Sequence, residues 1–94
     1  MLRLTESENA IRYSKMEQKL FKLMPRNGKK ISTKMLKERY YAAEQEEEPF
    51  AARSIINSSL KALIEKIRRN KEPFIIQHTG RHGPNAAEIW IEEQ

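Results

Sequence analysis

The spacing of apolar residues changes near residue 70, and this change limits the folds open to the chain. Upstream, apolar residues recur every three or four positions, as on one face of an amphipathic helix. Downstream, the β-forming runs "PFIIQH" and "AEIWIEE" flank "TGRHGPNA", which has the Gly and Pro residues of a turn. The sequence therefore predicts an α+β protein in which helices precede a C-terminal β-hairpin, with Ile89 and Ile91 on one face of the second strand.

Local signals define the first predicted helix, at about 14–24. Ser14 followed three positions later by Glu17 is a capping-box signature, because each side chain can accept a hydrogen bond from the other residue's backbone N–H. Pro25 and Gly28 end the helical pattern.

Ser32 is a favourable N-cap for a second helix, expected at about 33–43. Ile31 precedes it and is placed to pack against Leu36 as a hydrophobic staple. Residues 30–32 can also form a short edge strand. The side chains expected to be buried by this helix are Met35, Leu36 and Tyr40.

The longest predicted helix spans about 51–70 and would be near 30 Å long. It contains Asn57, Ser58 and Ser59, each a poorer helix former than Ala by roughly 0.5 kcal/mol, so a factor other than propensity favours them. One alternative is that the helix begins later, with Asn57 or Ser58 as its cap. The predicted buried stripe consists of Ile56, Leu60, Leu63, Ile64 and Ile67.

Charge is unevenly distributed along the 94 residues, which form one predicted domain at 13–94 after an N-terminal arm or short strand at 1–12. The net charge is +5, from 18 Lys and Arg against 13 acids, all of them Glu. Four Glu lie in "EQEEE" at 44–48 and three in the last seven residues, leaving six among all 18 basic residues. Such segregation is typical of a nucleic-acid-binding face, although a basic chain can also be merely soluble.

Several classes of function are disfavoured by composition. The absence of Cys excludes disulfides, thiol catalysis and Cys-ligated zinc. No Asp, nucleophile elbow or phosphate loop is present, so no enzyme and no cofactor are predicted. His78 and His82 have no evident third ligand, so no metal site is predicted either. No apolar run of ~18 residues and no signal-peptide pattern occur, which favours a cytoplasmic protein without membrane contact.

From Phe21 onward, about three quarters of the chain resembles the winged helix-turn-helix DNA-binding family. It is most similar to the effector domains of bacterial response regulators. The segments "LFKLMPRNGKKISTKML", "RSIINSSLKALIEKI" and "PFIIQHTGRHGPNAAEIWI" correspond to the first helices, the recognition helix and the two-stranded wing. No receiver domain is attached, there is no room for that family's full N-terminal sheet, and its usual glycine-and-tyrosine wing ending is replaced by Gly80–Gly83. The resemblance implies three helices, a C-terminal hairpin wing and DNA binding.

Sequence reading is assigned to the outer side of helix 51–70, as the resemblance implies for a recognition helix. Small polar residues allow close approach to base edges in the major groove. Asn57 suits a bidentate contact with adenine, and the two cations suit guanine or phosphate. The alternative is a polar surface patch without a nucleic-acid role. The candidate residues are Arg53, Ser54, Asn57, Ser58 and Lys61.

Phosphate contacts are assigned to the start of helix 33–43 and to the wing. The basic cluster there consists of Lys29, Lys30, Lys34 and Lys37, with Thr33 beside it, close to free helix N–H groups that can hold a phosphate. Arg81 and His82 at the wing tip can reach a groove or the backbone. For both groups the alternative is ordinary solvated surface.

The predicted function is sequence-specific binding of double-stranded DNA by a bacterial or phage-type transcriptional regulator, with a homodimer as an open alternative. The rival hypothesis is a protein-interaction adaptor, because fold does not dictate function. As an adaptor, the chain would use the acidic segment 44–48 to dock a basic partner. If it binds DNA, Glu46, Glu47 and Glu48 are candidates for contact with transcription machinery. Phe74 and Trp90 are expected to pack the hairpin rather than to stack on bases.

Overall fold

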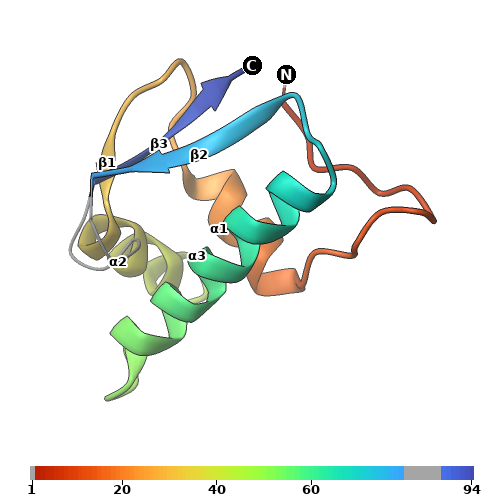
Figure 1. Ribbon diagram of the computed structural model, residues 1–94. Coiled ribbons are helices and arrows are strands. Elements are labelled where there is room, and N and C mark those ends of the chain that lie inside the picture. Colours follow the sequence, from red (N-terminus) through yellow and green to blue (C-terminus); the bar gives the residue numbers. More distant parts are fainter. Residues whose placement is uncertain (1, 80–87) are drawn as a thin grey trace.

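The computed structural model describes residues 2–79 and 88–94 and confirms the α+β class. Within these residues, three helices accompany one antiparallel sheet with strand order β1-β3-β2 (Figure 1). None of the three helices is both long and apolar enough to cross a membrane. The elements are α1 (Lys15–Leu23), β1 (Ile31–Ser32), α2 (Thr33–Ala43), α3 (Ala52–Arg69), β2 (Phe74–His78) and β3 (Glu88–Glu93).

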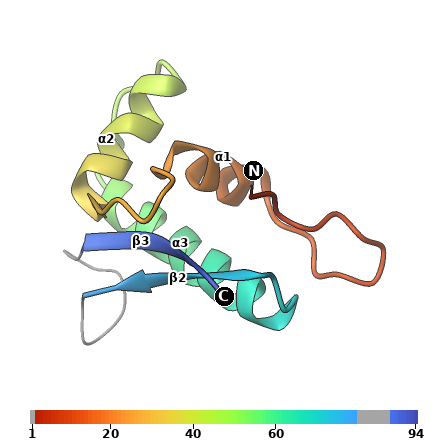
Figure 2. The ribbon, with the colours of Figure 1, turned by 90° about the horizontal axis from the view of Figure 1, so that it is seen from above.

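The core lies between the helices and one face of the sheet. In both views α3 runs beneath strands β2 and β3 (Figures 1 and 2). Side chains alternate along the strands, so Ile89 and Ile91 are both buried on the core face, as predicted. Phe74 is buried on the same face and stacks on Phe21 of α1, with 5.3 Å between the ring centroids. Trp90 faces the other way and is half-buried.

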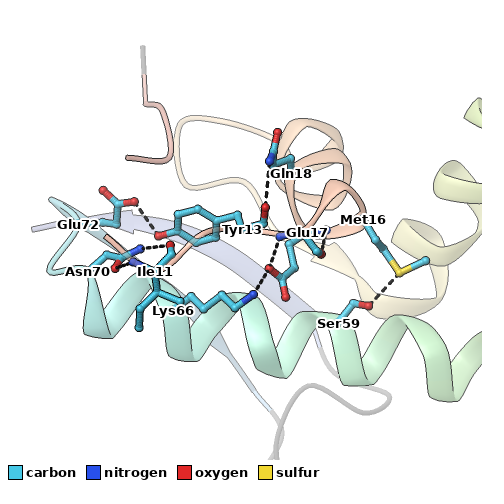
Figure 3. Close-up of polar contacts among 10 residues, drawn as sticks. Ile11, Tyr13, Met16, Glu17, Gln18, Ser59, Lys66, Asn70 and Glu72 are labelled. Atoms are coloured by element: carbon cyan, nitrogen blue, oxygen red, sulfur yellow. Dashed lines mark hydrogen bonds and ion pairs between the residues drawn. The ribbon is translucent and has the colours of Figure 1, made fainter. Parts of the chain in front are cut away.

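Helix α1 begins with the predicted capping box. The Ser14 side chain accepts from the Glu17 backbone at 3.1 Å, and the Glu17 carboxylate accepts from the Ser14 backbone at 2.7 Å. The same carboxylate is 2.7 Å from Nζ of Lys66 on α3 (Figure 3). Glu17 is only 4% exposed, so capping and ion pairing together satisfy a charge that would otherwise be costly to bury. The box therefore also joins α1 to α3.

Helix α2 has the predicted bounds, and the prediction for Met35 is wrong. Ser32 caps the helix through a hydrogen bond from the Met35 backbone at 3.0 Å, and Leu36 and Tyr40 are buried as expected. Met35 is 45% exposed, because it lies roughly 120° around the helix from the buried side centred between those two residues. Ile31–Ser32 forms the short edge strand, paired with β3.

Helix α3 starts at Ala52 without a side-chain cap, so the alternative start at Asn57 or Ser58 is wrong. The hydroxyl of Ser59 donates to the sulfur of Met16 on α1 at 2.8 Å, which gives one of the three weak helix formers a packing role (Figure 3). The stripe residues Ile56, Leu60, Leu63 and Ile67 are fully buried, and Ile64 is partly buried.

Residues 2–14 form neither helix nor strand and pack beside the C-terminal end of α3. Thr5 and Tyr13 both donate to the carboxylate of Glu72, the backbone of Thr5 at 2.8 Å and the hydroxyl of Tyr13 at 2.7 Å. The backbone of Ile11 makes two hydrogen bonds with the side chain of Asn70 (Figure 3). We call residues 2–12 the N-terminal arm.

Candidate nucleic-acid interface

A pocket of about 330 Å³ lies between α2 and the N-terminal half of α3. It brings together side chains from two helices that are separated in the sequence by the acidic segment 44–48. All of its six lining residues except Ile56 belong to the groups predicted to contact DNA. The lining residues are Thr33, Lys34 and Lys37 from α2 and Arg53, Ile56 and Asn57 from α3.

Positive charge at this pocket is available on two side chains. Lys34 and Arg53 are exposed, and neither takes part in an ion pair within residues 2–79 and 88–94. Lys37 differs, because its Nζ lies 2.9 Å from a carboxylate oxygen of Glu48. Lys34 and Arg53 can therefore meet an external anion without first breaking a salt bridge.

The exposed side of α3 carries small side chains and no acid along most of its length. Ser54, Ser58 and Lys61 are exposed, and Asn57 is half-buried at the border next to the pocket. No acidic residue occurs between positions 52 and 64. Between residues 52 and 64 the exposed side of α3 is therefore free of carboxylates, and Ile55 is its one large exposed apolar side chain.

The first acid on α3, Glu65, is neutralised by its own helix. Its carboxylate lies 2.7 Å from Arg68 and 3.0 Å from Arg69. The hydrogen bond from Arg68 lowers the pKa of Glu65, so the carboxylate stays ionised and paired. An approaching polyanion meets a compensated charge there.

The remaining predicted contacts lie elsewhere or have little free surface. The ammonium group of Lys30 sits 4.8 Å from the ring centre of Trp90, on the sheet rather than in the pocket. Thr33 lines the pocket but is only 6% exposed, which limits its hydroxyl as a contact. Arg81 and His82 fall outside the residues that the structure describes.

Ile56 was absent from the predicted contacts, and the ion pair made by Lys37, a member of the predicted basic cluster, was not expected. Lys37 lies one turn after Lys34, and that spacing was a usable signal for a shared helix face. Its pairing with Glu48 has no local signal, because it depends on the path of the connection between α2 and α3. Ile56 is 1% exposed and belongs to the buried stripe, so the pocket reaches down to the core.

No protein-family model matches the sequence, and neither a curated protein nor a solved structure matches it significantly. Among the described residues, no three His, Cys, Asp or Glu side chains lie close enough to share a metal ion. Function must therefore be inferred from the residues and geometry of this chain.

Proposed function

We propose that this chain is a winged-helix protein that binds double-stranded DNA in a sequence-specific manner, as a bacterial or phage-type transcriptional regulator does. Helix α3 enters the major groove, the start of α2 meets the phosphate backbone, and strands β2 and β3 form the wing. The order α1, β1, α2, α3, β2, β3 supports this proposal, because it is the order that the resemblance to winged-helix domains implies.

The observation that carries the proposal is the character of the exposed side of α3. B-DNA has a major groove about 12 Å wide, which admits an α-helix only if its side chains leave room and its charge does not repel phosphates. Ser54 and Ser58 leave room, and the adjacent cations Arg53 and Lys61 attract phosphates. The same polar residues that weaken helix propensity thus suit a groove.

Different roles follow for the two helices. Asn57 can accept from and donate to adenine with its side-chain amide, which makes it a base-reading residue. Lys34 stands on the neighbouring helix at the pocket rim, where it can contact phosphate without distinguishing sequences. Substitution of Asn57 is therefore expected to affect sequence preference, and substitution of Lys34 to affect binding to all duplexes.

The test begins with selection of a preferred site from randomised duplex DNA. Asn57→Ala should weaken binding to the selected duplex by roughly 1–3 kcal/mol and leave random duplex almost unaffected. Lys34→Ala should weaken both duplexes by a similar factor. Lys15→Ala serves as the control, because Lys15 is an exposed cation on α1 that does not line the pocket. If Asn57→Ala weakened binding to the selected duplex and to random duplex by the same factor, Asn57 would not read bases.

A second candidate function, docking to a protein, is favoured by Phe50. This side chain is fully exposed next to Glu46, Glu47 and Glu48. Aromatic side chains, Phe among them, are enriched at protein interfaces, whose rims are polar. The partner would have a basic surface with an apolar pocket. If the adaptor hypothesis is correct, Phe50→Ala should abolish partner binding, and the protein should not be retained on heparin or random duplex at low salt.

A further inference from the structure

A second and larger pocket, of about 770 Å³, lies between the N-terminal arm and α1. Its volume falls within the ~300–1,000 Å³ range of small-molecule sites. It shares no lining residue with the pocket between α2 and α3. The residues that determine its chemistry are Leu2, Leu4, Ile11, Tyr13, Phe21 and Arg26.

The arm is held to the body at Thr5 and Ile11, two of the residues that line the pocket. Thr5 is bound through its backbone N–H and hydroxyl to Glu72, and Ile11 is bound through its backbone N–H and carbonyl to Asn70. Tyr13 closes the segment with its hydrogen bond to Glu72 (Figure 3). The pocket is therefore formed before any ligand arrives, which lowers the entropy lost on binding.

The lining is apolar over much of its extent. Leu2 and Leu4 are partly buried against the core, and Phe21 and Tyr13 are buried. Ile11 remains 39% exposed, although it is one of the larger apolar side chains of the arm. A ligand with an apolar body would cover Ile11 and gain burial that the free protein lacks.

Arg26 presents an incompletely used guanidinium to this pocket. Its Nη1 donates to the carbonyls of Phe21 and Met24, at 3.0 and 2.8 Å, and the group lies 4.5 Å from the centre of the Phe21 ring. These contacts hold the half-buried group in place. The Nε and Nη2 donors have no acceptor, and Arg26 has no ion-pair partner, within the part of the chain that the structure describes.

We propose that the arm pocket binds a small molecule with an apolar body and a carboxylate head. The body packs against Leu4, Ile11 and Phe21, and the carboxylate accepts hydrogen bonds from Nε and Nη2 of Arg26. A planar carboxylate matches that edge of a guanidinium with two parallel hydrogen bonds.

The surrounding charges favour an anionic head. Three further cations line the pocket, and they outnumber its two carboxylates, Glu6 and Glu8. These cations are Arg3, Arg12 and Lys22. The site does not depend on DNA binding.

Calorimetry with decanoate, below its micelle concentration, tests the site on the full chain. Decanamide is the uncharged comparison, because it keeps the apolar body and lacks the carboxylate. We expect one decanoate per chain, with decanamide binding at least about tenfold more weakly. Arg26→Gln should lower decanoate affinity at least about tenfold and leave decanamide affinity unchanged.

Two further variants keep the result interpretable. Ile11→Ala, at a partly exposed position, should weaken decanoate and decanamide by the same factor, whether or not Arg26→Gln folds. Lys15→Gln removes a positive charge outside the pocket and should change neither affinity. The proposal is overturned if decanoate does not saturate the protein, if decanoate and decanamide bind equally, or if folded Arg26→Gln binds decanoate like the unchanged protein.

Discussion

Glu72 is a buried carboxylate whose partners in the described part of the chain are hydrogen-bond donors rather than cations. It accepts from Thr5 and from Tyr13, residues that lie far from it in the sequence. Hydrogen bonds to a charged group are stronger than neutral ones, and leaving such a group without partners is costly. The side chain of Glu72 therefore fixes the arm to the body of the protein.

The contribution of Tyr13 to the free energy of unfolding should depend on pH. Burial, followed by the hydrogen bond to Glu72, raises the pKa of Tyr13 above the ordinary value of about 10. Because the folded pKa is raised, the stabilisation is fully present below the unfolded pKa and is lost as pH rises through the folded pKa. We expect Tyr13→Phe to lower the free energy of unfolding by roughly 1.5–3 kcal/mol near neutral pH.

Urea unfolding of Tyr13→Phe and of the unchanged protein, from neutral pH to about pH 11, measures the difference in their free energies of unfolding. The difference in the free energy of unfolding should be constant up to about pH 10 and should narrow above it, because Tyr13 ionises there in the unfolded state while it stays protonated in the folded state. A difference that does not change across this range would mean that folding does not raise the pKa of Tyr13.

At the scale of elements, the bounds of the helices were predictable because their signals are local. Ser14 and Ser32 cap the helices that follow them, within three or four residues of their partners. The alternation that placed Ile89 and Ile91 on one face is also a local pattern. Met35 was misassigned because its apolar character was considered without its angle on the helix.

The sites were only partly predictable, because their geometry depends on contacts between distant residues. Lys34, Arg53 and Asn57 line one pocket, but their adjacency was expected only from the family resemblance. The arm pocket was missed entirely. Arg26 is held by backbone carbonyls, which carry no residue-specific signal, and the arm is fixed by Glu72, 67 residues from Thr5.

Substitutions on the buried and the exposed side of α3 should affect stability and DNA binding differently. Leu60 is fully buried, so Leu60→Ala should lower the free energy of unfolding by about 2–5 kcal/mol. Ser58 is exposed, so Ser58→Ala should raise it by up to roughly 0.5 kcal/mol, because Ala is the better helix former.

Urea denaturation of the two variants measures both changes, with DNA affinity measured in parallel. If Ser58 contacts DNA, Ser58→Ala should weaken binding while it stabilises the fold. A variant that is more stable and binds DNA unchanged would show that Ser58 is surface without a nucleic-acid role.

At the scale of the whole molecule, two of the acidic residues between α2 and α3 form ion pairs with Lys side chains. Glu44 forms an ion pair with Lys19 of α1, and Glu48 with Lys37 of α2. Each pair removes one negative charge and one positive charge from the surface. The cations left without such partners in the described chain include Lys34, Arg53 and Lys61, which surround the candidate interface.

Salt dependence should report how many of these cations meet phosphate. If about six phosphates are neutralised, a plot of the logarithm of the association constant against the logarithm of salt concentration should have a slope of about −5. Lys34→Ala should make that slope shallower by about 1, whereas Lys15→Ala should leave it unchanged. Fluorescence anisotropy with a labelled duplex across a salt series measures the slopes. A slope near zero would contradict DNA binding, because cations that contact a duplex release its counterions. The exposed Phe50 and its acidic neighbours would then be the binding surface to test.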